Sequence, residues 1–232
     1  MTAATPPTLP VRDAAPDGRR ADRYPRALLG AFAVVFAALA VAPWYRQDWL
    51  LENLLVLVAV PLLALNHRRL PLSNFAYTCL FAFFVLHEIG AHYTYSEVPW
   101  RGWLAALGVD GEPRVPGRNH YDRLVHFCYG LLVMPAAWEV LRARTAPRGM
   151  WRYLLPVLFI LSHSTIYELI EWAAASVFGG DLGVAYLGTQ GDQWDAQKDM
   201  ALAALGAVLG LGVVLLRELW RSRTGRPGGS TE

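Results

Sequence analysis

Long apolar stretches alternate with short polar ones along the whole chain. Residues 27–42 and 200–216 contain no charged residue, and four other stretches carry only a few polar ones. A helix needs about 20 largely apolar residues to cross a hydrocarbon core of about 30 Å, and in lipid it satisfies its own backbone hydrogen bonds. We therefore predict an all-α, polytopic membrane protein, a bundle of about six transmembrane helices. The predicted helices cover residues 27–45, 49–65, 72–92, 121–141, 151–178 and 196–217.

Composition supports this class of protein. Hydrophobic residues make up 54% of the chain and charged residues 17%, against roughly a quarter charged in a soluble domain. The period-two alternation of a membrane β-barrel is absent. A net charge of only +2 gives no sign of a nucleic-acid partner, and that class is set aside.

The basic residues indicate the orientation of the bundle. Of the 21 Lys and Arg residues, 15 fall in segments on one side of the predicted membrane and 6 on the other. By the positive-inside rule, both termini are predicted to be cytoplasmic. The predicted parts are a disordered basic cytoplasmic tail at 1–26, a six-helix domain at 27–217 with an outer loop at 93–120, and a disordered cytoplasmic tail at 218–232.

Polar residues gather at the predicted outer ends of the helices. Ionisable side chains inside membrane helices are costly and mark functional sites by default. Glu52 and Asn53 stand at the outer end of helix 49–65. Residues three or four apart share a helix face. Pairs with this spacing are Glu88 with His92, Asp122 with His126, Glu168 with Glu171, and Asp195 with Asp199, and His163, Tyr167 and Glu171 form a triple.

Acids outnumber bases among these side chains, which leaves a cation or a proton as the missing partner unless several of the acids lie in water. Two bases, Arg123 and Lys198, stand against seven acids, which are Glu88, Asp122, Glu168, Glu171, Asp192, Asp195 and Asp199. Buried carboxylates must be paired, protonated or bound to a cation. Oxygen ligands mixed with imidazole suit Zn, Mn or Fe, whereas a mostly carboxylate set suits Mg or Ca. We expect a divalent metal ion, Zn, Mn or Fe rather than Mg or Ca. The candidate ligands are His87, His92, Asp122, His126, His163, Glu168, Asp195 and Asp199.

The leading hypothesis is a metal-dependent hydrolase that acts on a membrane lipid or lipid-linked substrate at the extracytoplasmic leaflet. A bound metal ion lowers the pKa of its water toward about 7 and polarises an ester or phosphoester. Glu88 or Glu171 is the candidate general base. Arg123 or Lys198 is the candidate stabiliser of the developing anion.

Two other classes of function remain open. A cation- or proton-coupled small-solute transporter would bind its coupling ion with the same carboxylates, and a homodimer would compensate for the short chain. A non-catalytic membrane scaffold or lipid-binding factor would act through the outer loop, in which residues 100–107 predict a short amphipathic segment. Structural roles also stay open for Asp192 as a helix N-cap and for His163 as a core histidine.

The polar motifs, taken in order, resemble a known family. They are His87-Glu88-x-x-Ala91-His92-Tyr93-Thr94-Tyr95, Tyr121-Asp122-Arg123-x-x-His126-Phe127, Tyr167-Glu168-x-x-Glu171-Trp172, and Gly191-Asp192-x-Trp194-Asp195-x-Gln197-Lys198-Asp199-Met200. Together they are similar to the YjdF-like family of bacterial inner-membrane proteins, over residues 30–217. The resemblance implies a small multi-pass protein of the inner membrane and carries no activity with it. A fainter similarity, at Asp122, His126 and Asp199, is to VanZ-like membrane proteins.

Overall fold

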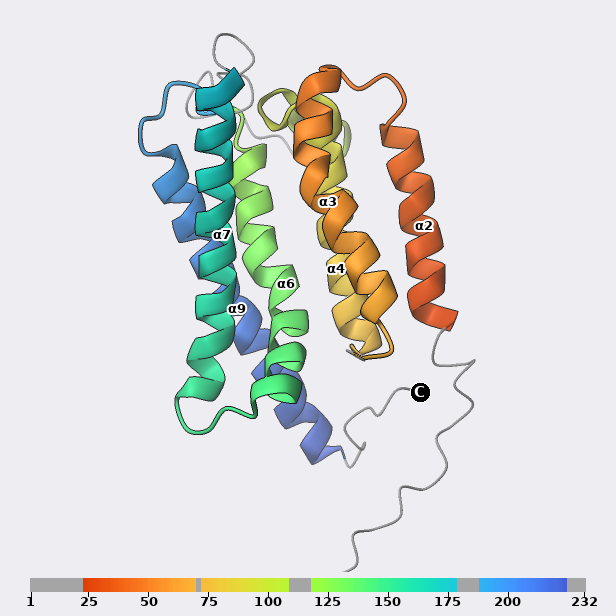
Figure 1. Cartoon of the computed structure of the whole chain (residues 1–232), viewed down its shortest axis with the longest axis vertical. Helices are drawn as coiled ribbons and strands as arrows, with labels where there is room; N and C mark the ends of the chain where they lie inside the picture. The colour runs from red at the N-terminus through yellow and green to blue at the C-terminus, as the bar shows by residue number, and fades with distance from the viewer. Residues whose placement is uncertain (1–22, 70–71, 109–117, 179–187, 225–232) are drawn as a thin grey trace, which may run out of the picture.

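The computed structural model describes residues 23–69, 72–108, 118–178 and 188–224, and these form an all-helical bundle without a strand. Long helices run up and down side by side (Figure 1). They are α2 (Arg23–Leu39), α3 (Arg46–Asn66), α4 (Asn74–Tyr93), α6 (Tyr121–Thr145), α7 (Trp151–Phe178) and α9 (Asp195–Arg223). Between α4 and α6 lie a short 3-10 helix, η1 (Tyr95–Glu97), and a short helix, α5 (Trp100–Ala106), where the sequence predicted an amphipathic segment.

Five of these helices are long and apolar enough to cross a membrane, namely α3, α4, α6, α7 and α9. The remaining long helix, α2, has 17 residues, which corresponds to about 26 Å against a hydrocarbon core of about 30 Å. It ends at Leu39 rather than at the predicted residue 45, because Ala42 takes a left-handed φ of 49° just before Pro43.

Both predicted tails are shorter than the sequence suggested. Helix α2 begins at Arg23, so residues 23–26 are helical, and the rest of the predicted tail lies outside the described residues. Helix α9 continues to Arg223, six residues beyond its predicted end. Residues 109–117 of the predicted outer loop also lie outside the described part of the chain.

The two ends of the bundle differ in charge. The end where α2 begins and α9 finishes, called the basic end here, carries arginines such as Arg68, Arg144 and Arg223 (Figure 1). The opposite, acidic end carries the first turns of α3, α6 and α9, with Asp48, Asp122 and Asp195. That the basic end faces the cytoplasm stays a prediction from the arginine distribution.

Helix α4 packs against α2, α3 and α6, and α6 packs in turn against α7 and α9. The least exposed apolar side chains include Ala76, Met134, Ile160 and Trp138. Many leucines and valines, including Leu65 and Val208, lie exposed on the outside of the bundle. This distribution suits a helix bundle surrounded by lipid.

Helices α6 and α9 cross very closely. A Cβ atom built on Gly130 of α6 would collide with the backbone of Ala203 in α9, and one on Gly206 with the carbonyl of Phe127 in α6. Gly210 makes a similar close approach to α6. Small residues let membrane helices approach in this way. The crossing fixes the relative position of the polar residues that precede it on both helices.

Candidate functional site

Three helices bring acids and one histidine together near the acidic end. Ligand atoms of Asp122 and His126 on α6 and of Asp199 on α9 all lie within 4.8 Å of one another. His126 Nε2 lies 3.5 Å from Asp122 Oδ1 and 3.6 Å from Oε1 of Glu168, which α7 supplies. We call these four residues, Asp122, His126, Glu168 and Asp199, the acid–histidine cluster.

The close crossing of α6 and α9 explains why the cluster forms. Asp122, His126 and Gly130 follow one another at intervals of four and therefore share one face of α6. On α9, Asp199 and Gly206 are seven residues apart and likewise share a face. The faces that meet through small residues at the crossing therefore also present the carboxylates and the imidazole to each other.

Two carboxylate oxygens of the cluster have no hydrogen-bond partner among the described residues. They are Oδ1 of Asp199 and Oε1 of Glu168, and the Asp199 side chain is almost fully buried, with 2% of the residue exposed. Buried polar groups are normally paired, and a buried carboxylate needs a counter-charge or a proton. Three carboxylates and one imidazole form a mixed oxygen and nitrogen set, which suits Mn, Fe or Zn.

Further acids surround the cluster. Glu52 of α3 is buried and accepts a 2.6 Å hydrogen bond from the hydroxyl of Tyr167 on α7. Glu171, one turn beyond Tyr167, interacts electrostatically with Asp122, Glu52 and Glu168. Glu52 is one of the polar residues at the outer helix ends, and the sequence alone assigns it no role. Its four-residue spacing from Asp48 was a signal that both face inward.

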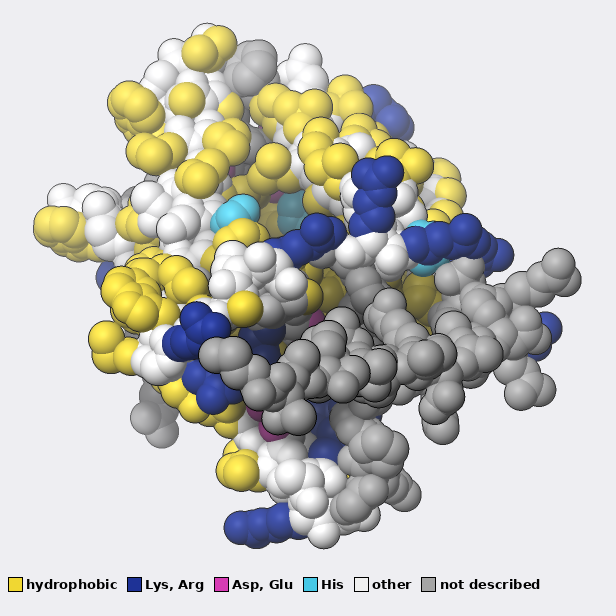
Figure 2. Space-filling model, turned by 60° about the horizontal axis from the view of Figure 1, so that its bottom comes forward, with side chains coloured by type: hydrophobic (Ala, Val, Ile, Leu, Met, Phe, Trp, Pro, Cys, Tyr) yellow, Lys and Arg dark blue, Asp and Glu magenta, His cyan; other side chains and the backbone are white. Residues whose placement is uncertain are grey.

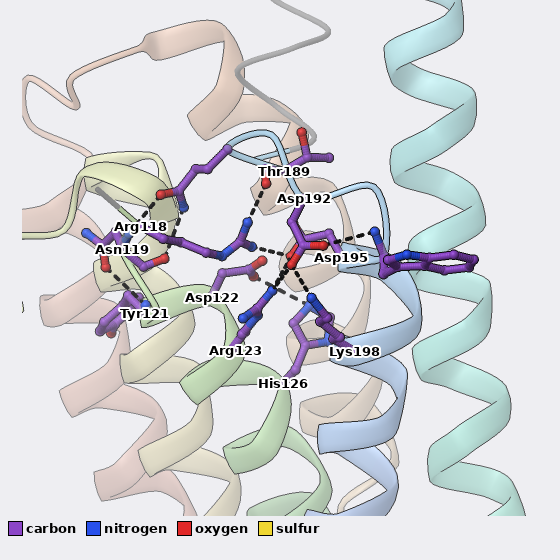
Figure 3. A network of polar contacts seen from close by, with 12 residues as sticks. Arg118, Asn119, Tyr121, Asp122, Arg123, His126, Thr189, Asp192, Asp195 and Lys198 are labelled. Atoms are coloured by element: carbon purple, nitrogen blue, oxygen red, sulfur yellow. Dashed lines mark hydrogen bonds and ion pairs between the residues drawn. The ribbon is translucent and has the colours of Figure 1, made fainter. Parts of the chain in front are cut away.

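Arg123 and Lys198, the two bases that the sequence suggests as anion stabilisers, form ion pairs with acidic side chains. Arg123 Nη2 lies 2.5 Å from Asp192 Oδ2 and 3.3 Å from Asp195 Oδ1, and Lys198 Nζ lies 2.5 Å from the same Asp192 oxygen (Figure 3). The hydrogen bond from Lys198, followed by those from the Trp194 backbone and Arg123, holds the pKa of Asp192 well below its usual 3.8. Asp195 therefore belongs to this ion-pair network and not to the acid–histidine cluster.

The network also ties two loops together across the acidic end. Arg118 donates hydrogen bonds to the carbonyl of Thr189 and to Asp195. Asn119 and Gln190 exchange a pair of hydrogen bonds, at 2.8 and 3.0 Å. The segment before α6 and the segment before α9 are thus held to each other directly above the cluster (Figure 3).

His87 lies on α4, buried, with its Nδ1 2.5 Å from the hydroxyl of Tyr95. The ring of Tyr95 fits there because residue 90 is glycine, and a Cβ at Gly90 would lie 2.6 Å from Tyr95 Cε1. Burial raises the pKa of the Tyr95 phenol, which therefore stays protonated. The Nε2 of His87 has no hydrogen-bond partner among the described residues.

Glu88 and His92 lie on a different side of α4 and do not join the cluster. Glu88 shares its face with Phe84, whose ring packs against Phe32 of α2 at 5.6 Å. His92 Nδ1 lies 2.8 Å from the carbonyl oxygen of Leu39 at the end of α2. The pair was expected in the common pocket, but its face of α4 is turned toward α2. Glu88 is fully buried, and neither of its oxygens has a hydrogen-bond partner in the described part of the chain.

His163 is exposed on α7, with Nδ1 2.9 Å from the carbonyl oxygen of Phe159. It therefore lies outside the cluster, although it lines the same cavity as His87. That cavity is a groove of about 620 Å³ between α3, α4, α6 and α7. The acidic end of the groove is polar, with His87, Asp122 and His126 in its wall, and most of the remaining wall is apolar.

These features define a class of protein: a multi-pass helical membrane protein with a buried acid and histidine site near one end of its bundle. The comparisons with known proteins agree with that class. The chain belongs to the family of predicted membrane proteins described as DUF2238, whose pattern matches residues 24–219.

A curated relative supports the same assignment. The chain is 39% identical over 168 residues to the inner membrane protein YjdF of Escherichia coli (strain K12), an alignment that covers 70% of this chain and 75% of the relative. The resemblance read from the polar motifs is thereby confirmed, and the chain is a multi-pass protein of the bacterial inner membrane. No solved structure matches the chain.

Proposed function

We propose that this protein is a metal-dependent hydrolase that cleaves an ester or phosphoester of a membrane lipid. The observation that carries the proposal is the acid–histidine cluster, in which ligand atoms of Asp122, His126 and Asp199 lie within 4.8 Å of one another. Its position at the polar end of an apolar groove suits a substrate with a polar head and an apolar chain. The positive-inside rule assigns this end to the extracytoplasmic leaflet.

Asp122, His126 and Asp199 would hold the metal ion, with Glu168 as a fourth ligand. A metal ion in such a site lowers the pKa of a bound water and polarises the bond to be cleaved. Three carboxylates offset its charge, and one imidazole favours Mn, Fe or Zn over Mg or Ca. Oδ1 of Asp199 and Oε1 of Glu168 accept no hydrogen bond from the described residues and would be available as ligand atoms.

Glu171 is the general base in this proposal, because it stands within electrostatic range of Asp122 and Glu168. The oxygen of a water molecule forms a bond to the phosphorus or acyl carbon, and the bond from that atom to the lipid's ester oxygen breaks. Glu171 accepts a proton from the water and returns it to the leaving oxygen. Glu88 takes no part, since its face of α4 is turned toward α2.

Arg123 and Lys198 have a different role from the one expected at first. Both are paired with Asp192, so their charge is already compensated. In the proposed enzyme they hold the loop before α9 over the cluster and limit the access of bulk water to it. Exclusion of water strengthens the electrostatic interactions inside a site.

The lining of the groove supports a transporter less than it supports a hydrolase. A coupled transporter needs a polar path on both sides of a site near the midplane. Toward the basic end the groove is lined mostly by apolar residues such as Leu80, Val133, Ala137 and Val140. The scaffold alternative would act through the segment that contains α5, and deletion of residues 98–117 tests it independently.

The hydrolase is tested with purified protein reconstituted in vesicles of total membrane lipid from the expression host. The vesicles are stripped with a chelator and then supplied with Mn²⁺ or Zn²⁺, and lipid species are quantified by mass spectrometry. We expect one lipid class to fall and its hydrolysis product to rise only when metal is added. The change should be absent in His126→Gln and retained in Tyr153→Phe. No metal-dependent change in any lipid species would contradict the proposal.

A further inference from the structure

The groove is longer than one leaflet of a membrane. On α6 its lining residues run from Asp122 to Leu141, which is about 28 Å along a helix. On α3 the lining continues to Asn66, the last residue of that helix. One leaflet contributes half of a hydrocarbon core of about 30 Å, so about 15 Å. A chain that lies in the groove with its head at the acidic end therefore reaches well into the opposite leaflet.

The groove is open on the side that faces the bilayer. Its floor consists of buried residues on α4 and α6, such as Leu80 and Ala137. Its rims are exposed residues on α3 and α7, with Val58 57%, Leu62 54% and Ile166 51% exposed. A hollow between apolar walls, with histidine side chains inside it, is visible from the basic end (Figure 2). Access from the membrane is therefore sideways, between α3 and α7.

A buried histidine lines the polar end of the groove. His87 is more than nine-tenths buried and lines the groove, and its Nε2 has no hydrogen-bond partner among the described residues. The Tyr95 hydroxyl holds the other ring nitrogen of His87 and so fixes the orientation of the ring. A headgroup at the cluster can therefore contact both His87 and His126 while its chain follows the apolar wall.

We propose that the groove binds a polyisoprenoid lipid, whose single chain exceeds one leaflet in length, and that this lipid enters sideways between α3 and α7. That the lipid headgroup is hydrolysed rests on the proposed function, whereas the binding of the lipid's hydrocarbon chain in the groove does not. An ordinary phospholipid has chains that match one leaflet and would leave the part of the groove near Leu62 and Asn66 to a lipid of the other leaflet. The length of the apolar track favours one long chain over two short ones.

The test is photo-cross-linking in native membranes with benzoylphenylalanine at single positions. Leu62 and Ile166 are the groove positions. Leu65 and Leu169 are matched controls on the same helices, exposed but outside the groove. After purification and digestion, mass spectrometry identifies the lipid attached to each peptide. We expect polyprenyl adducts at the groove positions, enriched about tenfold over the controls, which corresponds to a preference of about 1.4 kcal/mol.

Two outcomes would overturn this inference: phospholipid adducts at Leu62 and Ile166 in the same proportions as at the controls, or no lipid adduct at the groove positions. The Asp199→Asn variant separates the two proposals, because it removes a metal ligand and leaves the groove intact. In Asp199→Asn we expect the metal to be lost and the polyprenyl adducts to persist, and loss of the adducts would contradict a chain that binds independently of the reaction. Polyprenyl adducts on unmodified protein that contains no metal would reject the hydrolase and keep the lipid. Metal-dependent hydrolysis accompanied by phospholipid adducts would keep the hydrolase and reject the polyisoprenoid.

Discussion

The hydroxyl of Tyr167 on α7 donates a 2.6 Å hydrogen bond to the Glu52 carboxylate on α3. The two residues are 115 positions apart in the chain, and their helices form opposite rims of the groove. Helix α3 packs on α4 and α7 packs on α6 and α9, so this bond joins the two sides of the bundle. It bridges α3 and α7 near the acidic end of the groove.

Replacing Tyr167 by Phe removes this bond and leaves a buried oxygen of Glu52 without its donor. We expect the free energy of unfolding in detergent to fall by about 1–3 kcal/mol, measured by denaturant titration. Tyr153→Phe is the matched control, because the Tyr153 ring stacks on Trp138 and keeps that contact in the variant. Equal stability of the two variants would show that the Glu52 bond contributes nothing.

The α6–α9 crossing makes a second prediction. In Gly206→Ala the added methyl group meets the Phe127 carbonyl and forces the helices apart, which we expect to cost about 1–3 kcal/mol of stability and to weaken metal binding. Gly212→Ala is the control, since a Cβ there meets nothing within 4 Å, and it should retain both properties. Metal binding is measured by titration of the purified variants. A Gly206→Ala protein as stable and as metal-competent as Gly212→Ala would contradict the account.

Much of the fold could be predicted from the hydrophobic pattern, because a single segment that spans lipid satisfies its backbone hydrogen bonds only as a helix. The pairs Asp122–His126 and Glu168–Glu171 could be predicted to point one way, since their spacing is a local property of a helix. The pattern could not show which neighbour each face meets. That depends on the glycines at the crossing, such as Gly130 and Gly206, whose role appears only when the helices are packed together.

Glu88 also shows that local spacing does not reveal which neighbouring helix a face packs against. Its four-residue spacing to His92 places both side chains on one face of α4. Helix α4 packs against α2, α3 and α6, and this face is turned toward α2. His87, one residue earlier, is turned to the groove. One residue corresponds to 100° of rotation, and nothing in the local sequence tells which of the two faces the site.

The ion-pair network predicts a particular pH dependence. Asp192 has a lowered pKa, mainly through its hydrogen bond from Lys198, so its stabilising effect is complete above the usual carboxyl pKa and is lost only as the pH falls through the lowered value. The difference in melting temperature between the protein and Asp192→Asn should stay constant from about pH 8 to about pH 5 and shrink below about pH 4. Thermal unfolding in detergent at each pH measures it. A difference that disappears between about pH 7 and about pH 5 would contradict this assignment.

Orientation is testable by cysteine labelling. In a background with Cys79 and Cys128 replaced by alanine, Ala106→Cys on α5 should react with a membrane-impermeant maleimide in intact spheroplasts. Thr224→Cys, directly after α9, should react only after permeabilisation. The reverse pattern would place the acidic end in the cytoplasm and overturn the assignment of the site to the extracytoplasmic leaflet.

The metal content of the purified protein tests the central claim most directly. Protein purified without chelator is analysed by inductively coupled plasma mass spectrometry, beside Asp199→Asn from the cluster and Asp192→Asn from the neighbouring ion-pair network. We expect a stoichiometric amount of Mn, Fe or Zn in the unmodified protein and in Asp192→Asn, and its loss in Asp199→Asn. Unmodified protein without stoichiometric metal, or Asp199→Asn with an undiminished content, would contradict a metal site at Asp122, His126 and Asp199.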